Sequence, residues 1–136
     1  MLFIYSYIDT GKVFRGEIYL ADLGDHVHSI QGGVRPVLIL QNDIGNKHST
    51  TVIVAPITTK KKRNLITHVQ IRKNCCGLKK DSVVLLEQIV TIEKCELKFK
   101  IGSVDVSTMK KINTATIASL DLDNSLSRYY GRVQTA

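Results

Sequence analysis

Arg35 stands directly before a proline and follows a pair of glycines in the stretch QGGVRPVLILQNDIGN, residues 31–46. Gly32 and Gly33 carry no side chain, so the loop that they form can approach a bulky ligand closely. Because Pro36 excludes the preceding residue from helical conformations, Arg35 is held extended at the mouth of the strand that follows. A guanidinium placed in this way offers five donors in a fixed fork, which can hold two phosphate oxygens. The stretch therefore indicates the binding of an anion, with Arg35 as its strongest chemical group.

A run of four adjacent cations follows the strand-like segment that ends at Thr58. The run comprises Lys60, Lys61, Lys62 and Arg63. Adjacent cations form an electrostatic funnel for a polyanion, and binding of this kind weakens steeply with salt. The alternative is a solvated turn, but the position of the run beside Thr58 favours contact with a nucleic acid.

The composition limits the class of protein that these residues belong to. A chain of 136 residues, 43% hydrophobic and 23% charged, suits one folded domain with a modest core. The formal net charge of +7 favours an anionic partner such as a nucleic acid or a membrane surface, although a generally basic protein is the alternative. No window approaches the length of a membrane span. Residues 1–14 lack the basic region and cleavage site of a secretory signal, and we interpret them as an extension without function.

Three cysteines bear on the compartment rather than on the chemistry. Cys75, Cys76 and Cys95 are odd in number and have no C-x-x-C spacing. We interpret them as reduced thiols in a cytoplasm. His26 and His28 form an H-x-H, but no carboxylate or cysteine stands at ligand spacing, so no metal site is predicted.

Five segments have the β-branched and apolar content of strands, and they are residues 16–23, 37–41, 50–58, 66–72 and 82–92. Pro56 requires an edge, a bulge or a strand end within the third. Ile66 and Ile71 are assigned to a buried face of the fourth, and the fifth predicts one long or two short buried strands. A short helical turn is expected at residues 93–99.

Residues 105–120 change to a helical period. The apolar face is assigned to Val106, Met109, Ile112, Thr116 and Leu120, and Asp105 or Ser107 can cap the start. The residues 122–136 lack periodicity and are expected to form a loose tail. Short strands followed by a helix predict a mainly β fold with α (α+β), built as a curved antiparallel sheet or partly open barrel.

The linked motifs of this chain resemble the MazF/PemK family of toxin endoribonucleases, most closely its Gram-positive MazF type. The motifs are RGEIYLADL, QGGVRPVLILQNDIGN, TTVIVAPIT, THVQI and DSVVLLEQIVTI, and they run from about Arg15 to Leu120. The resemblance implies a domain over residues 15–121 with a small SH3-like, CcdB/PemK-type β-barrel and a C-terminal helix. It further implies a homodimer, an acidic MazE-like antitoxin, no cofactor, and metal-independent cleavage of single-stranded mRNA to a 2′,3′-cyclic phosphate and a 5′-hydroxyl.

The resemblance also assigns roles to residues. Arg35 and Thr58 match the catalytic arginine and threonine, and the RNA-binding residues are expected to be Gln31, Gly32, Gly33, Lys60, Lys61, Lys62, Arg63 and Gln88. Gln88 could read a base edge or make a buried hydrogen bond. Tyr19 or His26 could stack on a base, although Tyr19 also suits the core. The U-A-C-A-U element favoured by relatives transfers only weakly.

One loop position departs from the family pattern. Many relatives have glutamate where this chain has Ile30, so a carboxylate is replaced by an aliphatic side chain. If that glutamate moves protons in relatives, His28 or Gln31 could take a changed role, since histidine titrates near neutrality. The departure keeps two alternatives open, namely a catalytically silent barrel that binds a protein as the CcdB-like gyrase inhibitors do, and a plain RNA-binding module.

Overall fold

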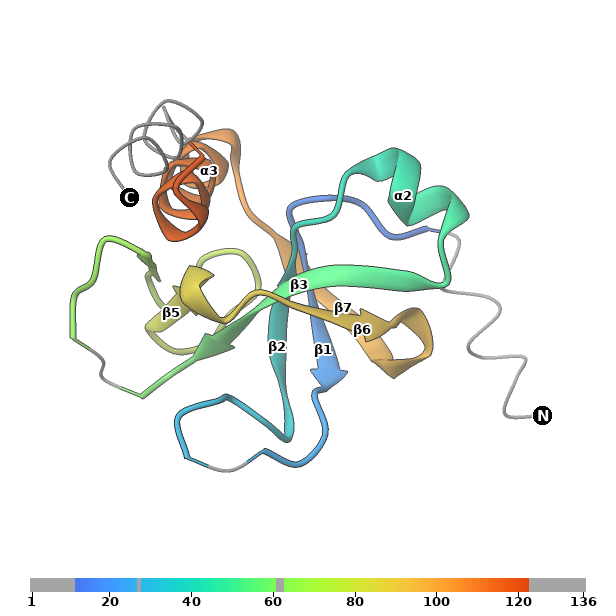
Figure 1. The fold of residues 1–136 in the computed structure, drawn as a ribbon. Coiled ribbons are helices and arrows are strands. Elements are labelled where there is room, and N and C mark those ends of the chain that lie inside the picture. Colours follow the sequence, from blue (N-terminus) through green and yellow to red (C-terminus); the bar gives the residue numbers. More distant parts are fainter. Residues whose placement is uncertain (1–11, 27, 61–62, 123–136) are drawn as a thin grey trace, which may run out of the picture.

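The computed structural model describes residues 12–26, 28–60 and 63–122. Its elements are β1 (Glu17–Asp22), β2 (Val34–Ile39), α2 (Asp43–His48), β3 (Thr51–Thr58), β4 (His68–Ile71), β5 (Ser82–Leu85), the 3-10 turn η1 (Leu86–Gln88), β6 (Val90–Glu93), the 3-10 turn η2 (Lys94–Glu96), β7 (Leu97–Ser103) and α3 (Val106–Leu120). Figure 1 shows α3 at one end of a curved sheet and the β1–β2 loop projecting at the other end. No helix in the described ranges is long and apolar enough to cross a membrane.

The seven strands form one antiparallel sheet in the order β4-β5-β3-β2-β1-β7, with β6 pairing beside β3. The predicted α+β class, mainly β with a C-terminal helix, is confirmed, while closure into a barrel stays a prediction. The β1–β7 ladder shifts its register twice, and such irregularities increase the local twist that curves a sheet.

Both faces of the central strands are apolar, which follows from the alternation of side chains along a strand. One face places Ile18, Leu38 and Ala55 on neighbouring strands, and α3 covers it with Ile112 and Ala115. The opposite face carries Tyr19, Val37 and Val54. The same buried cluster also contains Val13, Ala21, Leu23, Ile39 and Val52. Tyr19 is therefore a core residue.

The strand β3 reconciles a proline with a central position in the sheet. Residues 51–54 pair with β6, whereas Ile57 and Thr58 pair with β5. Pro56 falls in the gap between these two ladders, where its missing N–H costs no hydrogen bond. Pro56 is therefore accommodated inside a central strand by a change of pairing partner, and not by the edge, bulge or strand end that the sequence predicted.

The helix α3 begins where its cap was predicted, but its buried face is shorter. Asp105 accepts a hydrogen bond from the Thr108 N–H at 2.7 Å, and this bond lowers the pKa of the Asp105 carboxyl. Only Ile112 and Ala115 are buried, whereas Val106 and Leu120 are exposed, so their assignment to the apolar face is wrong. The reason is that α3 makes its main contacts with η1 and β4, which are too short to cover both helix ends.

Three further sequence expectations need correction. Ile66 is 78% exposed because β4 begins only at His68. The segment 82–92 forms two short strands, but only β5 is buried, since η1 turns the chain outward before β6. The turn expected within residues 93–99 is η2, whereas α2 and β7 were not predicted.

Candidate functional site

Arg35 and Thr58 lie at the ends of neighbouring strands. Val37 of β2 stands opposite Pro56 of β3, and extending this antiparallel register by two residues places Arg35 opposite Thr58. Arg35 is the second residue of β2 rather than part of the preceding loop, because the strand begins three residues earlier than predicted. Both residues line one cavity of about 390 Å³.

This first cavity combines an apolar floor with a basic rim. Its walls are Val34, Arg35, Pro36, Ile57, Thr58, Thr59, Lys60, Leu78, Lys79, Lys80 and Ser82. The four cations among them face no carboxylate in the lining. Because like charges that gather without counter-charges raise the local potential, the cavity attracts an anion.

The Arg35 guanidinium is held by one bond and is otherwise free. Its Nε donates to the Gly32 carbonyl at 2.8 Å, and no carboxylate of the described residues pairs with it. Arg15 is a useful contrast, since its Nε donates to Leu40 O and its Nη2 to Asn113 Oδ1. Arg15 ties the residue that follows β2 to α3, whereas the outer nitrogens of Arg35 have no partner within the described chain. This is the expected state of a guanidinium that binds an external anion.

Thr58 presents a hydroxyl at the wall of the cavity. The residue is 3% exposed, and its Oγ1 accepts the Lys60 N–H at 3.2 Å. A hydroxyl that accepts one bond keeps its own hydrogen to donate. Thr58 can therefore donate to a group bound beside Arg35.

The loop that joins β1 to β2 is closed at its base by two backbone bonds. Leu23 N donates to Gly33 O, and Gly33 N donates to Gly24 O at 2.7 Å. Gly33 has a φ of +73°, and a Cβ on Gly32 would lie 2.8 Å from Gly24 O. The two glycines thus allow the loop to fold back on itself. This close packing of the loop backbone, rather than the approach of a ligand, explains why glycine occupies both positions.

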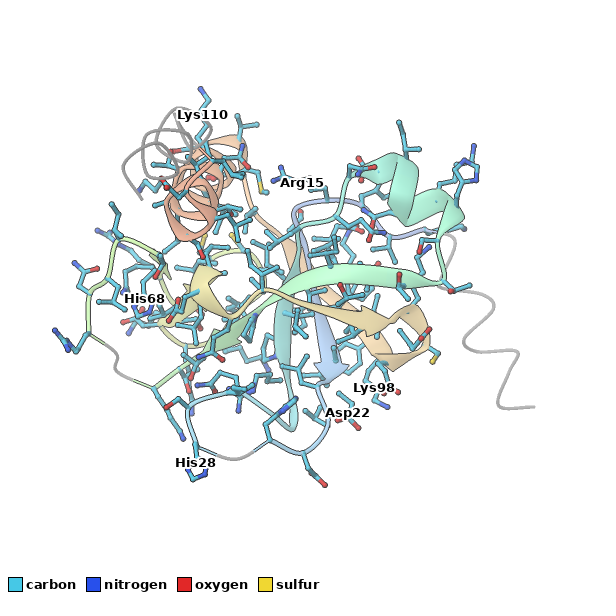
Figure 2. The ribbon with its side chains drawn as sticks, viewed as in Figure 1. Arg15, Asp22, His28, His68, Lys98 and Lys110 are labelled. Atoms are coloured by element: carbon cyan, nitrogen blue, oxygen red, sulfur yellow. The ribbon has the colours of Figure 1, made fainter. Side chains whose placement is uncertain are left out.

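A second cavity of about 470 Å³ lies on the loop side of Arg35. Its lining residues are Asp25, His26, His28, Ser29, Ile30, Gln31, Gly32, Gly33, Arg35 and Lys60. Arg35 and Lys60 line both cavities, so the guanidinium stands at their junction. His28 is exposed near the tip of the loop (Figure 2), with a φ of +63°. Ile30 is 60% exposed in the same wall.

Gln88 holds the loop between β1 and β2 through two hydrogen bonds. Its Oε1 accepts the Gln31 N–H at 2.8 Å, and its Nε2 donates to Ser29 O at 3.0 Å. The turn η1 that carries Gln88 is itself held by a pair between His68 Nε2 and Glu87 Oε2 at 2.9 Å. Burial acts to raise the pKa of Glu87, but the hydrogen bonds that it accepts, from His68 above all, outweigh burial and lower it.

The structure brings together most of the residues that the sequence singled out. Arg35, Thr58 and Lys60 meet at the first cavity, and His28, Gln31, Gly32 and Gly33 meet at the second. Gln88 contacts the loop instead of lining either cavity. His26 lines the second cavity with its ring Nε2 3.0 Å from Leu23 O. Arg63 is exposed and lines neither cavity, while Lys61 and Lys62 lie outside the described residues.

Sequence reasoning missed Lys79 and Lys80. The available signal was the pair of lysines shortly before the segment 82–92, which was predicted to be a strand.

In the described part of the chain, no three His, Cys, Asp or Glu side chains gather in a way that could hold a metal ion.

Comparison with known proteins gives concordant matches. A profile of PemK-like, MazF-like toxins of type II toxin–antitoxin systems matches residues 14–120. The chain is 52% identical over 109 residues to the endoribonuclease MazF of Staphylococcus saprophyticus. The matched region covers 79% of this chain and 91% of that protein.

Solved structures agree with the sequence match. A mycobacterial endoribonuclease in complex with its cognate antitoxin is 32% identical, with a TM-score of 0.69 over 82% of this chain and 97% of that one. MazF from Deinococcus radiodurans has the same fold, with a TM-score of 0.69 at 16% identity over 80% of this chain and 96% of that one.

Proposed function

Because this chain belongs to the family of PemK-like, MazF-like toxins of type II toxin–antitoxin systems, we propose that it is an endoribonuclease that cuts single-stranded mRNA at specific sequences without a metal ion. The products are a 2′,3′-cyclic phosphate and a 5′-hydroxyl. The observation that carries the proposal is the unpaired guanidinium of Arg35, which shares one cavity with the Thr58 hydroxyl.

The chemistry asks little of the protein beyond alignment and charge. In RNA the 2′-hydroxyl is already tethered beside the phosphorus, so no protein nucleophile is required. The 2′-oxygen forms a bond to phosphorus, the bond from phosphorus to the 5′-oxygen breaks, and one proton passes from the 2′-oxygen to the leaving oxygen. Arg35 stabilises the phosphate charge that grows during attack, and Thr58 donates a further hydrogen bond. Arg35 acts as a cation throughout, because a guanidinium resists deprotonation.

The same basic surface accounts for a protein partner. A related mycobacterial endoribonuclease has been solved with its cognate antitoxin. We propose that an acidic MazE-like antitoxin binds this chain and covers the cavities that hold Arg35, since a polyanion competes for the same cations. The homodimer and the cytoplasmic location expected from the sequence remain proposals.

The reaction can be tested on an mRNA transcript incubated with the protein in excess EDTA. We expect cleavage at a few sites at an undiminished rate, with 5′-hydroxyl ends that polynucleotide kinase labels without prior dephosphorylation. Loss of cleavage in EDTA with recovery on adding Mg²⁺ would contradict the proposed chemistry. Intact RNA with tight binding would favour the RNA-binding module, and inhibition of gyrase would favour the CcdB-like alternative.

Gln88→Ala is expected to lower kcat about tenfold or more with little change in KM. The two bonds to Ser29 O and Gln31 N are lost, so the loop that supplies Gly32 O to Arg35 is no longer fixed. Small errors in placement are costly, since a displacement of about 1 Å can cost about 100-fold in rate. Steady-state kinetics measures the split, and hydrogen exchange should show faster exchange at the Gln31 and Gly33 amides.

The matched control is Gln70→Ala, because Gln70 is an exposed glutamine on β4 outside both cavities. It should leave kcat, KM and the exchange of the loop unchanged. A Gln88→Ala protein with normal kcat and altered base preference would show instead that Gln88 reads a base edge.

A further inference from the structure

Two lysines line the cavity of Arg35 and Thr58 from a part of the chain that carries no role so far. Lys79 and Lys80 belong to the segment between β4 and β5, more than forty residues after Arg35. They come to the site because β5 pairs with the end of β3, where Val83 stands opposite Thr58. The wall that they form is therefore a consequence of the strand order.

The backbone on both sides of the two lysines is anchored. On one side Leu78 is buried and exchanges backbone bonds with the turn before it, to Cys75 O and from Asn74 N. On the other side Ser82 is 2% exposed and its Oγ donates to Lys80 O at 2.8 Å. The lysine side chains are exposed, but their Cα atoms are held in place at the rim.

The turn before Leu78 is also fixed against β7. Gly77 has a φ of +85°, and a Cβ there would lie 2.2 Å from Ile101 O. A Cβ on Gly102 would lie 2.1 Å from Cys76 O. Such close contact leaves the turn little freedom to move, so the rim of the cavity is preformed.

The charges around Lys79 and Lys80 are unbalanced. The neighbouring carboxylate of Asp81 accepts the Lys73 N–H at 2.7 Å and is not part of the cavity wall. Neither lysine pairs with a carboxylate in the described chain. The cavity of about 390 Å³ falls within the range of ligand sites, about 300–1,000 Å³.

We propose that Lys79 and Lys80 form a subsite for the RNA backbone, which binds the phosphate of the nucleotide next to the one that is cut. The inference rests on the proposed function. Arg35 holds the scissile phosphate, the apolar floor of Val34, Pro36 and Leu78 receives the adjoining nucleoside, and the two lysines hold its outer phosphate. Contacts to phosphate position a nucleic acid without reading its sequence, so the subsite adds affinity but no base preference.

The test measures RNA binding by a Lys79→Gln/Lys80→Gln double variant. The probe is an RNA that the wild-type protein cuts, protected by a 2′-deoxy residue at the cut site. For single strands each neutralised phosphate contributes about 0.7 to the slope of log Kd against log salt. Because the two lysines hold one phosphate, the double variant should lose about 0.7 of that slope. Its cleavage sites on unmodified RNA should be unchanged, with a higher KM.

The control is Lys47→Gln/Lys110→Gln, which removes the same charge from α2 and α3. Lys110 lies at the opposite end of the molecule from the β1–β2 loop (Figure 2), and both residues are exposed. This variant should keep the full wild-type slope. A Lys79→Gln/Lys80→Gln protein that also keeps the full slope would overturn the inference and leave the proposed function intact. A wild-type protein that neither binds nor cuts RNA would overturn both.

A neutral methylphosphonate at single linkages near the cut then locates the contact. In the wild-type protein, one linkage next to the cut should show a loss of affinity that disappears in the Lys79→Gln/Lys80→Gln variant. A loss that persists unchanged in the variant at every linkage would contradict the assignment. Thermal unfolding of each variant should give the wild-type midpoint, because the substituted side chains are exposed.

Discussion

Arg35→Ala is expected to lower the rate of RNA cleavage by about a thousandfold while the fold stays intact. In the proposed reaction the side chain supplies the donors that stabilise the charge growing on the phosphate oxygens, and loss of one such donor in other enzymes costs about 100- to 1,000-fold. Its structural role is small, since it makes one bond to Gly32 O and is only half-buried. Single-turnover cleavage at saturating protein separates this loss of rate from weaker binding.

Two further arginine variants sharpen the result. Arg35→Lys keeps the charge but lacks the planar fork, so an intermediate loss is expected. Arg72→Ala removes an exposed arginine outside both cavities and should leave the rate unchanged. A rate for Arg35→Ala within about threefold of wild type would refute the role proposed for the guanidinium.

The elements that the sequence predicted well are those whose pattern is local. The strands β1 and β3 and the helix α3 carry their period and caps in contiguous residues, and each lies close to its expected position. The assignment of Ile66 failed because the position where a strand begins depends on its partner, and β4 pairs with β5 only from His68 onward. Alternation alone does not set that boundary.

The residues of the candidate site also fall into two groups, those that a local sequence motif identifies and those that only the strand topology brings to the site. Arg35 and Thr58 could be selected because each belongs to a motif of its own, and the β2–β3 register brings them together. Lys79 and Lys80 could not, because only the pairing of β5 with β3 brings them to the cavity. The bonds of Gln88 to a loop 57 and 59 residues away likewise leave no mark in the local sequence. Local motifs thus predicted the central groups of the site, whereas its second wall and its support depend on topology.

Ile30 stands where the family resemblance led us to expect a glutamate, and the structure shows what surrounds it. Ile30 is exposed in the wall of the polar second cavity, beside His28 and Gln31. Arg35 is at the junction of the two cavities, so a proton acceptor in this wall would lie on the loop side of the bound phosphate. Ile30 has no group that accepts a proton, so in the proposed reaction this position takes no part in moving the proton from the 2′-oxygen to the leaving oxygen.

A single 2′-deoxy substitution at the cut site is expected to abolish cleavage of an RNA that the protein otherwise cuts. Without a 2′-oxygen the substrate has no internal nucleophile. In the proposed mechanism Arg35 and Thr58, which line one cavity, offer only a positive charge and hydrogen bonds and do not replace that nucleophile. Affinity should change by less than about threefold, because the phosphates that dominate binding are untouched. Gel analysis of the cleavage products and a binding titration on the same oligonucleotide measure the two quantities.

The same substitution moved one nucleotide to either side serves as the control, since it removes one hydroxyl but leaves the attacking one in place. These RNAs should be cut at close to the rate of the unmodified strand. Cleavage at the deoxy position would mean that water or a protein group attacks phosphorus, and the products would then carry no cyclic phosphate. In the mechanism that we propose, Arg35 and Thr58 accelerate an attack by the ribose 2′-oxygen on the adjoining phosphate, so a substrate that lacks this oxygen would leave the two residues with no reaction to accelerate.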